Sequence, residues 1–186
     1  MEDLLRLFME MGKLKQEIRS GWKLIDIDNP ESVAEHSHRA SLIGYFISKE
    51  EDVDAEKVLK MLVFHDLAET RIGDIDKVES RYLNKHESEE RAIEDQVQLM
   101  SEEIGEEYKE LMKELNEEET KEAVVAVDAD LLECAIQAKE YMNRGYEKAE
   151  NWIDNVENAL KTETARRLLK DLRKQEDLWW KGLKDV

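Results

Sequence analysis

The chain has few of the residues on which several structural classes depend. It contains one cysteine, one proline and seven glycines among 186 residues. The single cysteine, Cys134, excludes an intramolecular disulfide framework and a cysteine-based zinc site. The shortage of glycine and proline argues against an all-β sandwich or barrel, which needs a turn roughly every 8–12 residues. We therefore expect an all-α fold, built from helices rich in Glu, Lys, Leu and Ala.

Positive charge is also scarce. The chain has 28 basic and 46 acidic residues, which gives a formal net charge of −18. This balance argues against a sequence-independent nucleic-acid binder and against a polybasic membrane-surface protein. The first residues do not resemble a signal peptide, and no apolar run approaches the roughly 18 residues that span a bilayer. We expect a cytosolic protein that binds neither nucleic-acid polymers nor membranes.

Apolar residues make up 41% of the chain and recur at helical spacing, so they can form a core. No repeat, low-complexity linker or proline-rich boundary divides the sequence, and we predict one domain over residues 1–186. Ser32 to Glu35 matches a capping box, which predicts a helix start. An ordered loop precedes it, and an exit loop is expected over 70–74. The helices are predicted at about 2–19, 32–50, from 54 to His65 and Asp66, 86–103, 105–115, 117–142, 147–160 and 162–180.

Several polar residues fall on the apolar faces of these helices. His36 and Asp66 share such faces, and Asp130 lies in the middle of a stripe that runs from Ala123 to Tyr141. Burying an unpaired carboxylate costs several kcal/mol, so each aspartate needs a cationic partner. Two imidazoles and two carboxylates would suit Mn²⁺, Fe²⁺, Co²⁺ or Zn²⁺. Salt bridges to arginines, of which Arg19 and Arg39 are nearest in sequence, are the alternative, and spacing alone favours neither.

The run HDLAETRIGD adds two carboxylates to this set. Glu69 follows Asp66 by one helical turn, and Asp74 lies just beyond a glycine. Such acids can orient a water molecule or take its proton without binding the metal themselves. The pattern therefore favours hydrolysis over metal binding alone.

The pattern H…HD…D, at His36, His65-Asp66 and Asp130, resembles the HD-domain metal-dependent phosphohydrolases. The segments NPESVAEHSHR and MLVFHDLAETRIGDI strengthen this resemblance, which runs from about residue 4 to residue 142. They are similar to the branch of small proteins that includes 5′-deoxynucleotidases. The resemblance implies a helical domain with a metal-site core at about 30–142, followed by helices at about 147–180.

The resemblance also implies roles for individual residues. One divalent ion (Mn, Co, Mg, Fe or Zn) would be bound by two histidines and two aspartates: His36, His65, Asp66 and Asp130. Glu69 and Asp74 would position and activate the attacking water. Arg19 and Trp22 would contact the nucleotide, although two residues separate them here and none does in the bacterial enzymes.

The implied activity is hydrolysis of a 5′-(deoxy)nucleoside monophosphate to nucleoside and phosphate, and the implied assembly is a homodimer. A phosphodiesterase or pyrophosphohydrolase of the same superfamily is an alternative, although alarmone hydrolases have a second acid where Thr70 lies. A non-catalytic, metal-stabilised binding module is another. We expect His38 to point away from His36 around the helix and not to be a second ligand, and we expect His86 to be a surface residue. Cys134 should pack as a small hydrophobe, and Trp179-Trp180 should dock on the core or on a second copy.

Overall fold

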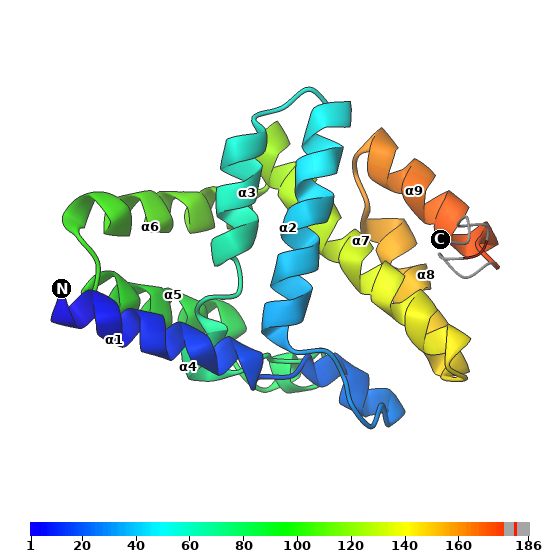
Figure 1. Ribbon diagram of the computed structural model, residues 1–186, viewed down its shortest axis with the longest axis horizontal. Helices are drawn as coiled ribbons and strands as arrows, with labels where there is room; N and C mark the ends of the chain where they lie inside the picture. The colour runs from blue at the N-terminus through cyan, green and yellow to red at the C-terminus, as the bar shows by residue number, and fades with distance from the viewer. Residues whose placement is uncertain (177–180, 182–186) are drawn as a thin grey trace, which may run out of the picture.

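The computed structural model of the chain describes residues 1–176 and 181. These residues form nine α-helices, several short 3-10 helices and no named β-strand, so the all-α prediction is confirmed (Figure 1). No helix in this part of the chain is long and apolar enough to cross a membrane. The helices are α1 (Glu2–Met11), α2 (Val33–Glu50), α3 (Ala55–Phe64), α4 (Glu69–Ile72), α5 (Lys85–Val97), α6 (Glu102–Glu117), α7 (Lys121–Asn143), α8 (Glu150–Ala159) and α9 (Glu163–Lys174).

Helix α7 is the centre of the fold. It packs against α2, α3, α6, α8 and α9, and Figure 1 shows it crossing α2 in the middle of the molecule. Its alanines allow these close approaches because they bury little volume, and Ala126, Ala129, Ala135 and Ala138 have no exposed surface. Being covered on several sides, α7 also buries two acids that its apolar stripe did not single out, Asp128 and Glu133.

A glycine brings α2 and α3 together. A Cβ atom at Gly44 would collide with the side chain of Leu62, so no larger residue fits unless that side chain shifts. Because α2 carries His36 and α3 leads into His65, this close packing sets the spacing between the two histidines. The capping box at the start of α2 is present as predicted: the Ser32 hydroxyl accepts from the Glu35 amide, and the Glu35 carboxylate accepts from the Ser32 amide.

The prediction of one helix over 2–19 was wrong in its second half. Helix α1 ends at Met11 and a 3-10 helix, Gly12–Lys15, follows it. Beyond that, Ile18 forms an isolated antiparallel bridge with Ser32, and the Arg19 amide donates to the Glu31 carbonyl. Tertiary pairing therefore overrides the helical periodicity and extends the backbone at Arg19. A second 3-10 helix, Ser20–Ile25, replaces the loop predicted there and carries Trp22 into the core.

The segment after α3 also differs from the prediction. Asp54 caps the start of α3 as expected, but the helix ends at Phe64, so His65 and Asp66 lie in the turn that follows it. Helix α4 occupies much of the predicted exit loop, and it ends at Gly73, whose positive φ of 76° favours glycine. This sharp turn separates Asp66 and Glu69 from the chain that carries Asp74.

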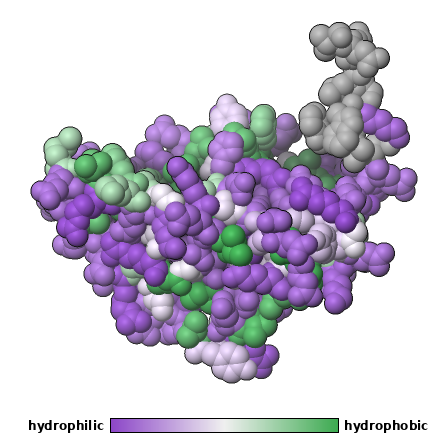
Figure 2. Space-filling view, turned by 60° about the horizontal axis from the view of Figure 1, so that its bottom comes forward, coloured by the Kyte–Doolittle hydropathy of each residue, from purple (hydrophilic) through white to green (hydrophobic). Residues whose placement is uncertain are grey.

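The remaining boundaries shift by a few residues. The helix predicted over 86–103 ends at Val97, and α6 extends beyond 105–115 at both ends. Helix α7 begins at Lys121 and not at 117, and it ends at Asn143. Helix α8 begins only at Glu150, after a 3-10 turn. The last helix ends at Lys174, and Trp179-Trp180 lie outside the described residues. Most of the face visible in Figure 2 is hydrophilic, in line with a sequence that is 40% charged.

Candidate metal centre and substrate pocket

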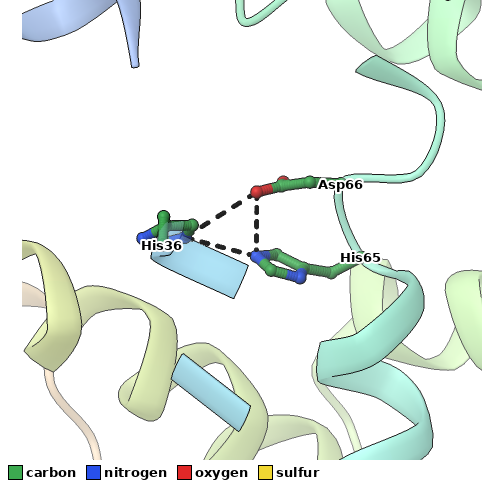
Figure 3. A group of neighbouring side chains, drawn as sticks. All are labelled: His36, His65 and Asp66. Carbon is green, nitrogen blue, oxygen red and sulfur yellow. Dashed lines mark hydrogen bonds and ion pairs between the residues drawn. The ribbon is translucent and has the colours of Figure 1, made fainter. Parts of the chain in front are cut away.

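His36 lies at the centre of the candidate site. Its side chain is fully buried on α2, and its Nε2 atom is 2.8 Å from Asp130 Oδ1 on α7. The same nitrogen is 3.4 Å from His65 Nε2 and 3.7 Å from Asp66 Oδ2 (Figure 3). Side chains from three separate parts of the chain therefore converge on one point.

His65 completes this arrangement with a defined tautomer. Its Nδ1 is 2.7 Å from the Leu62 carbonyl oxygen. A carbonyl can only accept, so Nδ1 carries the hydrogen and Nε2 is left to face the site. That Nε2 atom is 3.1 Å from Asp66 Oδ2 and 3.9 Å from Asp130 Oδ1. The four residues expected to bind a metal thus present two nitrogens and two oxygens to one small space.

The chemistry of these atoms fits a divalent cation. Asp66 Oδ2 is buried and has no hydrogen-bond partner among the described residues. A buried carboxylate oxygen without a partner is unfavourable unless a cation or water satisfies it. The donor atoms of His36, His65 and Asp66 all lie within 4.8 Å of one another, as a shared ion requires. A mixed set of imidazole and carboxylate groups suits Mn²⁺, Fe²⁺, Co²⁺ or Zn²⁺.

The alternative of salt bridges to arginine describes only part of the site. Arg19 Nη1 lies 3.7 Å from Asp66 Oδ2 and 3.7 Å from Asp74 Oδ1. Asp130 instead pairs with His36, and its side chain is one-third exposed. Arg39 faces away from both aspartates and pairs with Glu133 at 2.7 Å. Among the described residues, no arginine forms an ion pair with Asp130, so arginine accounts for only one of the two aspartates.

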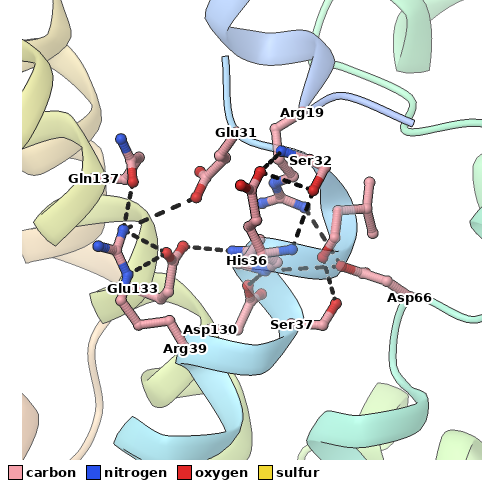
Figure 4. Close-up of polar contacts among 12 residues, drawn as sticks. Arg19, Glu31, Ser32, His36, Ser37, Arg39, Asp66, Asp130, Glu133 and Gln137 are labelled. Atoms are coloured by element: carbon pink, nitrogen blue, oxygen red, sulfur yellow. Dashed lines mark hydrogen bonds and ion pairs between the residues drawn. The ribbon is translucent and has the colours of Figure 1, made fainter. Parts of the chain in front are cut away.

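Glu133 is a functional candidate that the sequence analysis missed. Its side chain is fully buried, and Oε2 is 2.5 Å from His36 Nδ1. Its other oxygen accepts from Arg39 Nε at 2.8 Å, and Arg39 also donates to Gln137 (Figure 4). A further hydrogen bond runs from Arg39 to Glu140. A carboxylate behind a metal-binding histidine fixes the ring and its tautomer, leaving Nε2 for the metal. The available signal was an acid three residues after Asp130, inside the apolar run LLECA.

The surrounding charges shift the pKa values of these groups. Burial and Arg19 lower the pKa of His36, but hydrogen bonds with Asp130 and Glu133 outweigh them and raise it to about 10. Burial opposes ionisation of Asp66, yet His65 and Arg19 hold the pKa of that carboxyl well below its usual range. Without a metal, a proton on His36 therefore supplies one positive charge between two carboxylates, Asp130 and Glu133, and offsets one of their two negative charges.

Glu69 lies beside this cluster. Its side chain is 1% exposed, and neither carboxylate oxygen has a hydrogen-bond partner in the described part of the chain. Burial raises the pKa of Glu69 to about 10, and the neighbouring Asp66 and Asp74 carboxylates contribute to this rise. The nearest cation with a recorded ion pair is Lys85, whose Nζ is 3.6 Å from Oε1. Glu69 thus has an ion-pair partner but no hydrogen-bond partner in the described part of the chain, and its oxygens are available to a small polar molecule.

Asp74 is held more firmly. Its Oδ2 accepts from the Ser20 amide at 2.5 Å and from the Ser20 hydroxyl at 3.1 Å. Its Oδ1 faces Arg19 at 3.7 Å. The 3-10 helix that starts at Ser20 therefore fixes Asp74 near Asp66, although the two acids are separated by helix α4.

A pocket of about 420 Å³ opens next to these groups. Four acids line it, Asp66, Asp74, Asp76 and Asp130, and so do three cations that offset most of their charge, Arg19, Lys77 and Lys85. Helix α8 forms another wall. The sequence analysis treated the helices after residue 145 as a tail, whereas the structure brings α8 to the edge of the candidate site.

Trp22 lies at this pocket but offers little surface to it. The side chain is 2% exposed, its Nε1 donates to Glu31 Oε1 at 3.0 Å, and its ring stacks on Trp152 of α8. Arg19 lines the same pocket despite its separation from Trp22 in sequence. The structure therefore brings both residues to the site, with Trp22 mainly as part of the core.

Three expectations about other residues are confirmed. His38 and His86 are exposed. Cys134 is partly buried, and burial raises the pKa of its thiol to about 12, so the reactive thiolate is disfavoured. None of these residues joins the four that converge at His36.

The chain resembles proteins of known family. The family model described as "HD domain" matches residues 11–172. The 5′-deoxynucleotidase HDDC2 of Dictyostelium discoideum is 33% identical over 151 residues, which cover 76% of this chain and 78% of the relative. The human protein of the same name is 31% identical over 74% of this chain and 68% of its own length.

Solved structures agree with this assignment. A conserved hypothetical protein from Pyrococcus furiosus is 33% identical and superposes with a TM-score of 0.77 over 92% of this chain and 99% of its own. A predicted metal-dependent phosphohydrolase from Magnetospirillum magnetotacticum, 23% identical, shares the fold with a TM-score of 0.70 over 93% of each chain. With the converging histidines and aspartates, the family match over most of its length shows that this chain belongs to the HD-domain family.

Proposed function

We propose that the chain is a metal-dependent phosphomonoesterase that converts a 5′-(deoxy)nucleoside monophosphate to nucleoside and phosphate. The names of the relatives support the substrate class. The observation that carries the proposal is the buried carboxylate of Glu69, which lies beside the four converging side chains and has no hydrogen-bond partner among the described residues. A binding module stabilised by a metal would not need such a carboxylate, which is costly to bury.

In this proposal His36, His65, Asp66 and Asp130 hold one divalent ion. When bound, the ion acts as a Lewis acid toward a phosphoryl oxygen and lowers the pKa of water. Glu133 and the Leu62 carbonyl fix the two imidazole rings through their Nδ1 atoms. The ligands are thus oriented before the ion arrives.

Glu69 and Asp74 act on the attacking water. Asp74, held by Ser20, orients the water, and Glu69 accepts its proton on a carboxylate oxygen. The raised pKa of Glu69 suits a group that must hold a proton after taking it. Positive charge in the site would lower that pKa toward the range in which Glu69 is ionised before the reaction.

The cations of the pocket explain how an acidic protein can bind a dianionic phosphate. The chain has a formal net charge of −18, and four acids line the pocket, Asp66, Asp74, Asp76 and Asp130. Arg19, Lys77 and Lys85 lie on the same walls and supply local positive charge. We assign Arg19 to the phosphate, because it is fixed between Asp66 and Asp74 and cannot lose its charge.

The contacts of Thr70 argue against the pyrophosphohydrolase alternative. The Thr70 hydroxyl bonds Glu10 Oε1 and the Leu67 carbonyl, both at 2.9 Å, and it accepts from Gln96. The residue thus belongs to a structural network between α1, α4 and α5. It supplies neither the acid expected of alarmone hydrolases nor a free polar group.

The test is release of phosphate from a panel of substrates. It includes 5′-ribo- and 5′-deoxyribonucleoside monophosphates, nucleoside triphosphates and cyclic dinucleotides, each with Mn²⁺, Co²⁺ or Mg²⁺. We expect turnover of the monophosphates. Turnover restricted to triphosphates or cyclic dinucleotides would support the alternative instead.

Two further expectations belong to this proposal. We place the enzyme in the cytosol, and we expect it to act as a homodimer. Sedimentation analysis of the purified chain tests the second expectation, and fractionation of the source cells tests the first.

A further inference from the structure

Helix α8 contributes a second tryptophan to the pocket. Trp152 lines the pocket together with Trp22, but the two rings differ in exposure. Trp22 is 2% exposed, whereas Trp152 is only partly buried. A ring that is almost fully covered cannot offer a face to a ligand without moving. Of the two rings, Trp152 therefore presents aromatic surface to the pocket.

The Trp152 ring is held in place before any ligand binds. It stacks on Trp22, with ring centroids 5.0 Å apart and an angle of 30° between the planes. Its other neighbour is Gly21, where an added Cβ would lie 3.7 Å from two indole atoms. A longer side chain at position 21 would press against the indole. An aromatic surface fixed in this way can stack on a flat ligand with little loss of conformational entropy.

Amide groups flank this aromatic surface. Asn151 and Asn155 also line the pocket, and both belong to α8. Asn151 Nδ2 donates to the Lys148 carbonyl, which uses part of its capacity. No hydrogen bond of the Asn155 amide is recorded with the described residues, so it can both donate and accept. Asparagine amides are well suited to the donor and acceptor pattern on the edge of a nucleobase.

We infer that Trp152 is the surface on which the base of the substrate stacks, and that Asn155 contacts the edge of that base. This inference rests on the proposed function. The phosphate must lie beside Asp66 and Asp130, so the nucleoside extends over the remaining walls of the same pocket. Among those walls, α8 supplies a flat aromatic ring next to the Asn155 amide. Trp152 is thus a specificity-determining residue, and Trp22 supports it from behind.

The experiment compares two substrates that differ only in the base. Phosphate release is measured from 2′-deoxyadenosine 5′-monophosphate and from 2-deoxyribose 5-phosphate, for the wild type and for Trp152→Leu. Base stacking on an aromatic ring is worth about 1–3 kcal/mol, so we expect kcat/KM for the nucleotide to fall roughly 10-fold or more. The value for the sugar phosphate should stay within about twofold. If its turnover is too slow to follow, its inhibition constant against the nucleotide is compared instead.

Tyr146→Leu is the matched control. Tyr146 is a partly buried aromatic residue that packs near Tyr141, and it is not among the residues that line the pocket. This variant should leave kcat/KM for both substrates unchanged. A second variant, Asn155→Leu, should alter the ratio of kcat/KM between adenine and cytosine nucleotides. Its kcat/KM for the sugar phosphate should not change.

The outcomes separate this inference from the proposed function. If Trp152→Leu lowers kcat/KM equally for the nucleotide and for the sugar phosphate, its effect is structural and the assignment is wrong. The assignment is also wrong if kcat/KM changes for neither substrate. If the wild type with metal releases phosphate from neither substrate, the proposed function fails, and the assignment fails with it.

Discussion

The two sides of the candidate metal centre differ in how their polar groups are satisfied. On the α2–α7 side, His36 is bonded to Glu133, and Glu133 to Arg39. On the side formed by the turn after α3 and by α4, Asp66 Oδ2 and both oxygens of Glu69 have no hydrogen-bond partner among the described residues. The first side has the features of a rigid support. The second leaves polar atoms free for an ion and for water, so we place the chemistry there.

The largest expected effect comes from removing a ligand on either side. Asp66→Ala and Asp130→Ala should each abolish metal binding, because the remaining three side chains leave the ion an incomplete set of ligands. Phosphate release should fall to the background rate. Metal content by mass spectrometry and turnover are measured on the same samples. Full metal occupancy in Asp130→Ala would show that Asp130 is not a metal ligand.

Glu69→Gln tests the open side without removing a ligand. The variant should keep its metal, because Glu69 is not one of the four converging residues, and it should lose its proton acceptor. General base catalysis contributes roughly 10²–10⁴-fold, so kcat should fall by that factor. Wild-type turnover in this variant would show that the role assigned to Glu69 is wrong.

Glu133→Gln tests the support side. Loss of the charge behind His36 should weaken metal binding by about 10–100-fold, which is typical when the partner of a metal-binding histidine is changed. Metal affinity is measured by competition with a coloured chelator. Saturating metal should restore most of the activity, unlike in Glu69→Gln.

Glu140→Gln is the control for this variant. Glu140 accepts from the other end of the Arg39 guanidinium, at 3.0 Å, but has no recorded contact with His36. Its replacement should leave metal affinity within about twofold of the wild type. Equal weakening in both variants would mean that Arg39, and not the Glu133–His36 hydrogen bond, controls the site.

The last prediction concerns the pH dependence of metal affinity. Hydrogen bonds with Asp130 and Glu133 raise the pKa of His36 to about 10, so the histidine is protonated at neutral pH when no metal is bound. Binding must release this proton, and affinity should therefore rise about tenfold per pH unit between pH 6 and 9. Calorimetry in buffers of different ionisation enthalpy counts the released protons. A metal affinity that does not change between pH 6 and 9 would contradict the raised pKa of His36.

The convergence of His36, His65, Asp66 and Asp130 could be predicted because each residue lies in a short, recognisable pattern. Their roles as ligands remain a prediction. The helix over 2–19 could not be corrected from periodicity, because a backbone bridge from Ile18 to Ser32 ends it. The contributions of Glu133 and Trp152 depend on packing between helices that are far apart in sequence. No local pattern specifies such contacts, and the same holds for the burial of Trp22.

The most direct test of the central claim uses the wild-type protein alone. The chain is freed of metal with a chelator, and phosphate release from 2′-deoxyadenosine 5′-monophosphate is followed while Mn²⁺ or Co²⁺ is added back. We expect no release without metal and full activity at one ion per chain. Equal phosphate release by the metal-free chain, or one bound ion per chain without any release, would contradict the account.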